Sequence, residues 1–95
     1  ELAEAYEKIG DIQGGFGESH LGQREKSFES YSKALNIREN LVKTEPVNIE
    51  FRQKLAASYR KMSDAFWVQV DVVRSLENQQ KAFEIHRKLN EEVPD

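Results

Sequence analysis

Apolar residues recur along the chain at steps of three and four, with polar residues between them. Near the N-terminus the series consists of Leu2, Ala5, Tyr6, Ile9 and Ile12. This spacing places the apolar side chains on one side of a helix, so it predicts an amphipathic helix. The same period returns three more times. The four predicted helices lie near residues 1–14, 23–44, 48–69 and 72–92.

The ends of these helices are marked by particular residues. The glycine-rich segment Gly14–Gly22 predicts a loop, because each glycine in a helix costs about 1 kcal/mol. Pro46 ends the second helix, since proline cannot continue it. Asn48 and Asp71 are predicted N-caps, whose side chains accept bonds from early backbone N–H groups. The segment 67–73 alternates like a strand, but a single strand would leave its backbone unpaired, so we reject that interpretation.

The chain contains an internal repeat. Residues 55–64 are a near-copy of residues 2–11, and residues 75–85 are similar to residues 27–37. Each repeat therefore holds two predicted helices. We expect an all-α fold of two antiparallel helix hairpins within a single domain, 1–95. The first repeat covers about 1–47 and the second about 48–95.

The helical period also predicts the core. Two helices approach to about 8–10 Å only where side chains are short. The short residues expected at such contacts are Gly10, Ser27, Ala34, Ser63, Ser75 and Ala82. The residues expected to be largely buried are Leu2, Tyr6, Ile9, Tyr31, Ala34, Leu35, Leu55, Tyr59, Met62, Phe66, Ala82 and Phe83.

Composition narrows the possible functions. A net charge of −3 and 33% charged residues, without clusters of Lys and Arg, argue against binding to nucleic acid or to a membrane surface. The lack of cysteine excludes disulfides and thiolate metal sites. No apolar run approaches the roughly 20 residues of a membrane span, and we expect a cytoplasmic location. Because the chain begins at Glu1 without methionine and ends at Asp95, we expect a piece of a larger protein.

Few residues suggest catalysis or metal binding. His20 and His86 are far apart in the sequence and belong to no cluster of metal ligands, so we expect no metal and no cofactor. Ser19, His20 and Glu18 are neighbours in the glycine-rich loop, but they lack the oriented base and oxyanion donors of a hydrolytic site. We therefore expect no enzymatic activity. Whether the loop contacts a partner through Phe16 stays open.

Aromatic, apolar and small residues follow one another in both repeats, and the first repeat has five extra residues in its glycine-rich loop. In the second repeat these residues are Tyr59, Met62, Ser63, Phe66, Ser75 and Ala82. In the first they are Tyr6, Ile9, Gly10, Ser27, Tyr31 and Ala34. This pattern resembles the tetratricopeptide repeat, in the longer bacterial form that is found in tandem arrays and sometimes attached to bacterial serine/threonine protein kinases. The chain departs from the pattern at Gln13 and Gln79, where an aromatic residue is usual, and at Val70, where a turn glycine is usual.

The resemblance implies a non-catalytic scaffold that binds a peptide or protein segment in a concave groove. The first helix of each repeat would line this groove, which places Glu7, Asp11, Arg60, Asp64 and Trp67 there. Because acidic residues outnumber basic ones, we expect a neutral or basic partner segment. Packing of Trp67 against the next helix is the alternative. The alternative function is a regulatory or substrate-recruiting region of a multidomain bacterial signalling protein, such as a serine/threonine protein kinase.

The number of repeats bears on assembly. Solenoid repeats bury their apolar faces against neighbours, and three or more are normally needed for stability. With two repeats, parts of Phe83, Ile85 and Leu89 would face water, so we expect a homodimer through the end of the second repeat. In a second arrangement the helices on either side of Val70 would join and exchange between two chains, because valine does not favour the left-handed conformation that usually ends a helix.

Overall fold

The computed structural model describes residues 1–14 and 21–92, and these residues are almost entirely helical. The helices are α1 (Leu2–Gly14), α2 (Leu21–Thr44), α3 (Ile49–Val68) and α4 (Val72–Glu92). No strand occurs among the described residues, so the all-α prediction is confirmed and each helix lies within a few residues of its expected range. The loop predicted over Gly14–Gly22 is shorter at both ends, because its first residue and its last two are helical. The rest of that segment, including Phe16 and His20, lies outside the described residues.

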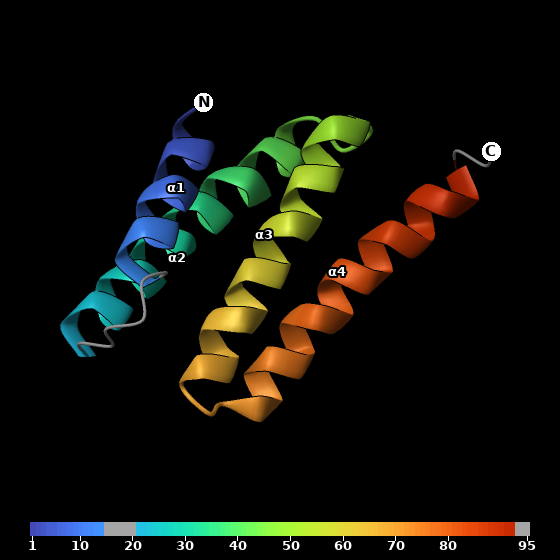
Figure 1. The fold of residues 1–95 in the computed structure, drawn as a ribbon. Coiled ribbons are helices and arrows are strands. Elements are labelled where there is room, and N and C mark those ends of the chain that lie inside the picture. Colours follow the sequence, from blue (N-terminus) through green and yellow to red (C-terminus); the bar gives the residue numbers. More distant parts are fainter. Residues whose placement is uncertain (15–20, 93–95) are drawn as a thin grey trace.

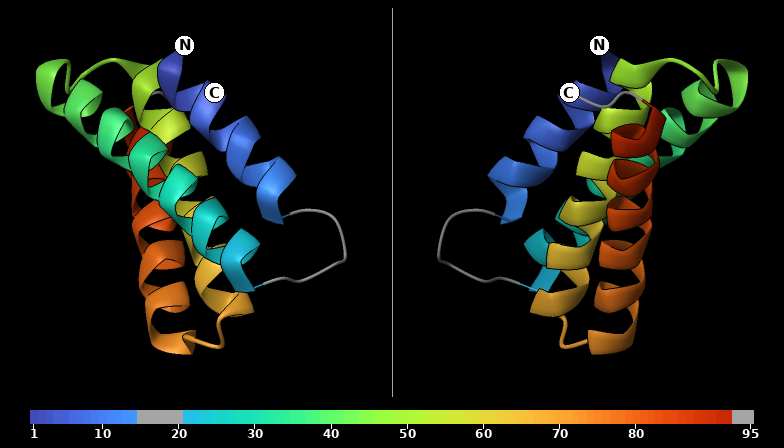
Figure 2. Two further views of the ribbon diagram at one scale, coloured as in Figure 1. Left: turned by 90° about the vertical axis from the view of Figure 1, so that its left-hand side faces the viewer. Right: turned by 90° about the vertical axis from the view of Figure 1, so that its right-hand side faces the viewer.

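The four helices pack in sequence order. α1 packs against α2, α3 packs against α4, and α2 packs against α3 between the two pairs. Figure 1 shows that the two helices of each pair run in opposite directions, as expected for antiparallel hairpins. Figure 2 shows α2 crossing obliquely over the pair formed by α3 and α4. The molecule is elongated, with principal dimensions of 43 × 28 × 21 Å.

Both predicted N-caps are present. The side chain of Asn48 accepts a hydrogen bond from the backbone N–H of Phe51, with an N···O distance of 3.0 Å. The side chain of Asp71 accepts a hydrogen bond from the backbone N–H of Arg74, with an N···O distance of 3.1 Å. Each cap satisfies a backbone donor that the first turn of the helix leaves without a partner. The two caps thus define where α3 and α4 begin.

The short residues lie where the helices cross, as predicted. All six of them are buried. Between α1 and α2, the Ser27 hydroxyl donates to the Gly10 carbonyl oxygen at 2.8 Å. Between α3 and α4, the hydroxyls of Ser63 and Ser75 lie 2.9 Å apart and share a hydrogen bond. Each hairpin is therefore held at its crossing point by short side chains that also satisfy their own polar atoms.

Six residues of the predicted core are buried, and they belong to α2, α3 and α4. These residues are Ala34, Leu55, Tyr59, Met62, Phe66 and Ala82. Three others are only partly buried, namely Tyr6, Tyr31 and Leu35. The prediction was wrong for Leu2, Ile9 and Phe83, which are 62%, 45% and 60% exposed. The reason is that, among the described residues, no helix packs against the outer side of α1 or of α4.

The opposite error occurs near the end of α4. Leu89 is buried and Ile85 packs partly buried against the core, although both were expected to face water. They follow Ala82 at steps of three and four, which places them on the side of α4 that faces α3. Phe83 lies on the outer side of the helix instead. α4 does expose an apolar side to water. Of the three residues predicted to form that side, only Phe83 lies on it.

The turn between α3 and α4 closes at Val70. Its φ is 61°, which is the left-handed conformation. The N–H of Val70 donates to the carbonyl of Trp67, and the N–H of Asp71 donates to the carbonyl of Phe66, both at 2.9 Å. These two bonds are the Schellman pattern that normally has glycine at the left-handed position. In this structure α3 and α4 are thus two separate helices, and the single joined helix that the sequence suggested is not observed.

Replacing Val70 by glycine is expected to raise the free energy of unfolding by about 1 kcal/mol. A side chain in the left-handed conformation costs about 1–2 kcal/mol, and the freedom that glycine adds to the unfolded chain offsets about half of this. Urea unfolding followed by circular dichroism measures the change. Val47→Gly is the matched control, because Val47 is exposed and has no positive φ, so this variant should lose stability. A Val70→Gly variant no more stable than Val47→Gly would contradict the strain at this turn.

Candidate functional site

Three of the residues assigned to a groove share one side of α3. Arg60, Asp64 and Trp67 follow each other at steps of four and three, so their side chains point the same way. All three are exposed. Trp67 is 63% exposed, so it does not pack against the next helix as the alternative interpretation required. We define these three residues as the α3 face.

Glu7 is used inside the fold instead. Its carboxylate accepts a hydrogen bond from Arg38 Nη2 of α2 at 2.8 Å and another from the Ser58 hydroxyl of α3 at 2.6 Å. The side chains of Arg38 and Glu7 are 5% and 12% exposed. The same Nη2 also lies 3.1 Å from a carboxylate oxygen of Glu1. Glu7 therefore links three helices and has little surface to offer a partner.

Asp11 is engaged as well, although half of its side chain is exposed. Both of its carboxylate oxygens accept hydrogen bonds from Lys61 Nζ of α3, at 2.8 and 3.1 Å, and one also accepts from the Tyr31 hydroxyl of α2. The ammonium group of Lys61 lies 5.5 Å from the centre of the Tyr31 ring. Asp11, Tyr31 and Lys61 thus form a polar cluster that connects α1, α2 and α3 beside the α3 face.

Two pKa values in this cluster are shifted. Partial burial opposes ionisation of Asp11, but the hydrogen bonds from Lys61 and Tyr31 outweigh it, and the pKa of Asp11 lies below its usual value. Burial raises the pKa of Tyr31, and so do the hydrogen bond to Asp11 and its negative charge. Asp11 is therefore held ionised and Tyr31 neutral. This combination stabilises the contact between the two side chains.

These contacts change the charge expected of the groove. Arg38 balances Glu7, and Lys61 balances Asp11. The α3 face itself carries one base and one acid, Arg60 and Asp64. The acidic excess inferred from the sequence is thus largely neutralised by ion pairs between the helices. We therefore expect the preference for a basic segment to be small.

Sequence reasoning missed the basic partners of the two α1 carboxylates. Arg38 pairs with Glu7 across 31 positions, and Lys61 pairs with Asp11 across 50. Lys61 directly follows Arg60 in the sequence, yet its side chain turns toward α1 rather than lying on the α3 face. No local signal could have found these pairs, because helical spacing relates only residues three or four apart.

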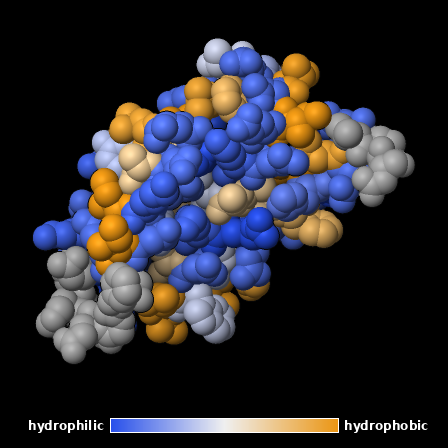
Figure 3. All heavy atoms as spheres, turned by 45° about the horizontal axis from the view of Figure 1, so that its top comes forward, coloured by the Kyte–Doolittle hydropathy of each residue, from blue (hydrophilic) through white to orange (hydrophobic). Residues whose placement is uncertain are grey.

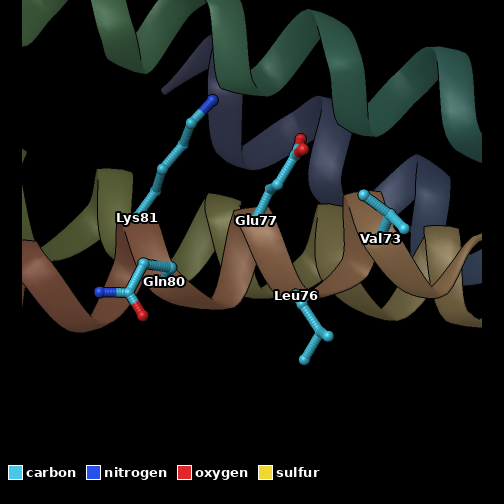
Figure 4. Close-up of a pocket in the computed structure, with 5 residues that line it drawn as sticks. All are labelled: Val73, Leu76, Glu77, Gln80 and Lys81. Carbon is cyan, nitrogen blue, oxygen red and sulfur yellow. The ribbon is translucent and has the colours of Figure 1, made fainter.

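A second feature is an open hollow on α4. It is lined by Val73, Leu76, Glu77, Gln80 and Lys81, all from that one helix. Figure 4 shows Glu77 and Lys81 pointing to one side of α4 and Leu76 to the other. The ammonium group of Lys81 lies 5.5 Å from the centre of the Tyr59 ring, so it is directed back toward α3. The hollow is shallow, and most of its surface is formed by the apolar atoms of these side chains.

The rest of the described surface offers little for chemistry. Within residues 1–14 and 21–92, no group of three or more His, Cys, Asp or Glu side chains could hold a metal ion. None of the described helices has the length and apolar character needed to cross a membrane. On the side of the molecule shown in Figure 3, hydrophobic side chains form small groups separated by polar ones. The α3 face and the exposed apolar side chains on the outer sides of α1 and α4 are therefore the candidate binding surfaces of the described residues.

The geometry defines an all-α protein in which two helix hairpins pack through their inner helices. No protein-family model, no curated protein and no solved structure matches the chain. The similarity to the tetratricopeptide repeat therefore stays an interpretation of the residue pattern and of the internal repeat.

Proposed function

We propose that the protein is a non-catalytic, cytoplasmic scaffold of the tetratricopeptide type, which holds a peptide or protein segment of a partner against the α3 face. The observation that carries this proposal is the exposure of Trp67. Tryptophan is enriched among the residues that contribute most to protein interfaces, since it combines a large apolar surface with an N–H donor. A partner that covers this ring would remove a large apolar area from water.

Arg60 supports the same surface. It lies two turns before Trp67 on the same side of α3, and it takes part in none of the ion pairs of the described residues. Its guanidinium group has five N–H donors, which suit a carboxylate or a row of backbone carbonyls on the partner. The binding surface would thus consist of an apolar anchor, Trp67, and a polar group, Arg60, that orients the bound segment. Asp64 between them would disfavour a strongly acidic segment.

Selection of binders from a random peptide library tests the proposal. The expected result is that Trp67→Ala weakens binding of the selected peptides by about 2 kcal/mol, or roughly thirtyfold, and that Arg60→Ala weakens it less. Val68→Ala is the matched control, because Val68 is the exposed neighbour of Trp67 but points in another direction. The affinity should change little between low and high salt, because the charges around the α3 face are balanced.

Fluorescence gives an independent measurement. Trp67 is the one tryptophan of the chain, so a blue shift of the intrinsic emission on binding would report burial of this ring. Peptides that bind without changing the emission, and equally well to the wild type and to Trp67→Ala, would place the binding surface elsewhere and refute the proposal.

A further inference from the structure

The first and the last helix, α1 and α4, each expose a row of apolar side chains. On α1 the row consists of Leu2, Ala5, Ile9 and Ile12, all exposed. On α4 it includes Val73, Leu76 and Phe83, also exposed. The α1 residues are separated by steps of three and four, and the α4 residues by steps of three and seven, so each row lies on one side of its helix. We call these rows the α1 face and the α4 face.

Within the molecule, corresponding sides of α2 and α3 pack against each other. The rings of Phe28 and Phe66 pack edge to face, with centroids 5.2 Å apart. The Ser32 hydroxyl lies 3.9 Å from the sulfur atom of Met62. Leu35 packs against the buried cluster that contains Leu55 and Tyr59. The Tyr59 hydroxyl donates to the carboxylate of Glu39 at 2.7 Å. This interface joins the two hairpins.

The internal repeat relates this interface to the two exposed faces. Aligning Ser27 with Ser75 pairs the four α2 residues of the interface, Phe28, Ser32, Leu35 and Glu39, with Leu76, Gln80, Phe83 and Arg87 of α4. Aligning Tyr6 with Tyr59 pairs the four α3 residues, Leu55, Tyr59, Met62 and Phe66, with Leu2, Tyr6, Ile9 and Gln13 of α1. The α4 face is thus the counterpart of the α2 side of the interface, and the α1 face is the counterpart of the α3 side.

We propose that the protein associates with further copies of itself head to tail, with the α4 face of one copy against the α1 face of the next. In this arrangement the contact between two copies repeats the packing of α2 against α3. Leu2 and Ile9 of one copy would cover Phe83 and Leu76 of its neighbour and remove these apolar side chains from water. The inference goes beyond the proposed peptide binding, because the α3 face takes no part in it.

The polar contact of the internal interface also has a counterpart. Tyr59 donates to Glu39, and the equivalent positions are Tyr6 and Arg87. Arg87 has N–H donors that its contacts with Glu84 and Glu91 do not exhaust, so it can donate to the Tyr6 hydroxyl. Donor and acceptor are exchanged, but the hydrogen bond can still form. The polar contact of the internal interface can therefore be repeated between copies, whereas the contact of Phe28 with Phe66 has Leu76 and Gln13 as its counterparts.

A head-to-tail contact is not symmetric, because it joins two different faces. The two faces differ, so a pair of copies still has one free face of each kind and can add a third copy. A dimer through two α4 faces, which the sequence suggested, would instead be symmetric and would stop at two. The two arrangements therefore predict different behaviour of variants that block one face only.

Sedimentation velocity of the 95-residue protein, up to about 1 mM, tests the proposal. The wild type should show masses that rise with concentration above the monomer value of 11.0 kDa. Ile9→Glu blocks the α1 face and Phe83→Glu blocks the α4 face, and each should weaken association about tenfold or more because a charge would have to be buried. An equimolar mixture of the two variants should form a dimer and nothing larger, since each copy retains one intact face.

Controls keep this result unambiguous. Val47→Glu changes an exposed apolar residue outside both faces and should associate like the wild type. Circular dichroism should show native helix content in every variant. If either variant fails to fold, Leu2→Glu and Leu76→Glu block the same faces. A wild type that stays monomeric overturns the proposal and indicates a different occupant of the faces. Normal association of Ile9→Glu, or a mixture that stays monomeric, overturns it as well.

Discussion

Replacing Arg38 by methionine is expected to lower the free energy of unfolding by about 3 kcal/mol, because it leaves the carboxylate of Glu7 buried without its counter-charge. Methionine keeps the apolar stem of the arginine side chain and lacks its charged guanidinium group, so the loss arises mainly from the missing charge. The Nε atom of Arg38 is itself buried without a hydrogen-bond partner, which means that removing the guanidinium group also removes one unfavourable feature. Urea unfolding followed by circular dichroism gives the difference.

Two further variants show whether the buried charge is the cause. Lys8→Met removes an ion pair with Glu4 in which both side chains are at least half exposed, so it should change stability by less than about 0.5 kcal/mol. Adding Glu7→Gln to Arg38→Met should recover part of the loss, because a neutral amide is less costly to bury and can still bond to the Ser58 hydroxyl. An Arg38→Met variant as stable as Lys8→Met would show that this buried pair contributes nothing to the fold.

Replacing Gly10 by valine is expected to cost about 3 kcal/mol, the upper end of the usual range for overpacking a helix contact. A Cβ atom at this position would lie 2.8 and 2.9 Å from two carbon atoms of the Tyr31 ring. The ring cannot move away freely, because its hydroxyl is bonded to Asp11 and its face is covered by Lys61. The greater helix propensity of valine over glycine offsets only a few tenths of a kcal/mol of this cost. Thermal and urea unfolding measure the result.

The matched control uses the same side chain on the exposed side of α1. Ala5→Val should cost only about 0.5 kcal/mol, which is the difference in helix propensity. In a Tyr31→Ala background, the cost of Gly10→Val should fall to a similar small value, because the ring that it would meet is gone. If Gly10→Val is equally harmful with and without Tyr31, the close approach of α1 and α2 at Gly10 is not the reason for the loss.

Much of the fold could be predicted because helix formation depends on neighbouring residues. Apolar spacing, Pro46 and the caps at Asn48 and Asp71 are local signals, and they located the four helices to within a few residues. Short residues at the crossing points were also predictable, since the distance between packed helices limits the size of the side chains there. Asp71 also located the turn between α3 and α4, but no local signal predicted the left-handed conformation of Val70, which valine does not favour.

The exposed residues were harder to predict, because helical period identifies an apolar side of a helix but not what covers it. Leu2 and Leu55 occupy the same place in the two repeats, yet one is 62% exposed and the other is 7% exposed. The difference arises because α2 packs against α3, while among the described residues no corresponding helix precedes α1. The exposure of Leu2 and the burial of Leu55 therefore follow from the order in which the helices pack, which is a property of the whole fold.

The sequence by itself determined the class of the fold, the four helices, their caps and the short residues at the crossings, because each depends on contacts within a helix or on the size of one side chain. The tertiary structure alone decided which charges remain for a partner. Glu7 and Asp11 look like surface acids on an isolated helix, but α2 and α3 bring Arg38 and Lys61 to them across 31 and 50 positions. Trp67 and Arg60 stay exposed because no helix of the described chain covers that side of α3. The physical reason is that electrostatic and packing interactions depend on distance in space. The spacing of residues along one helix does not determine the distances between residues of different helices.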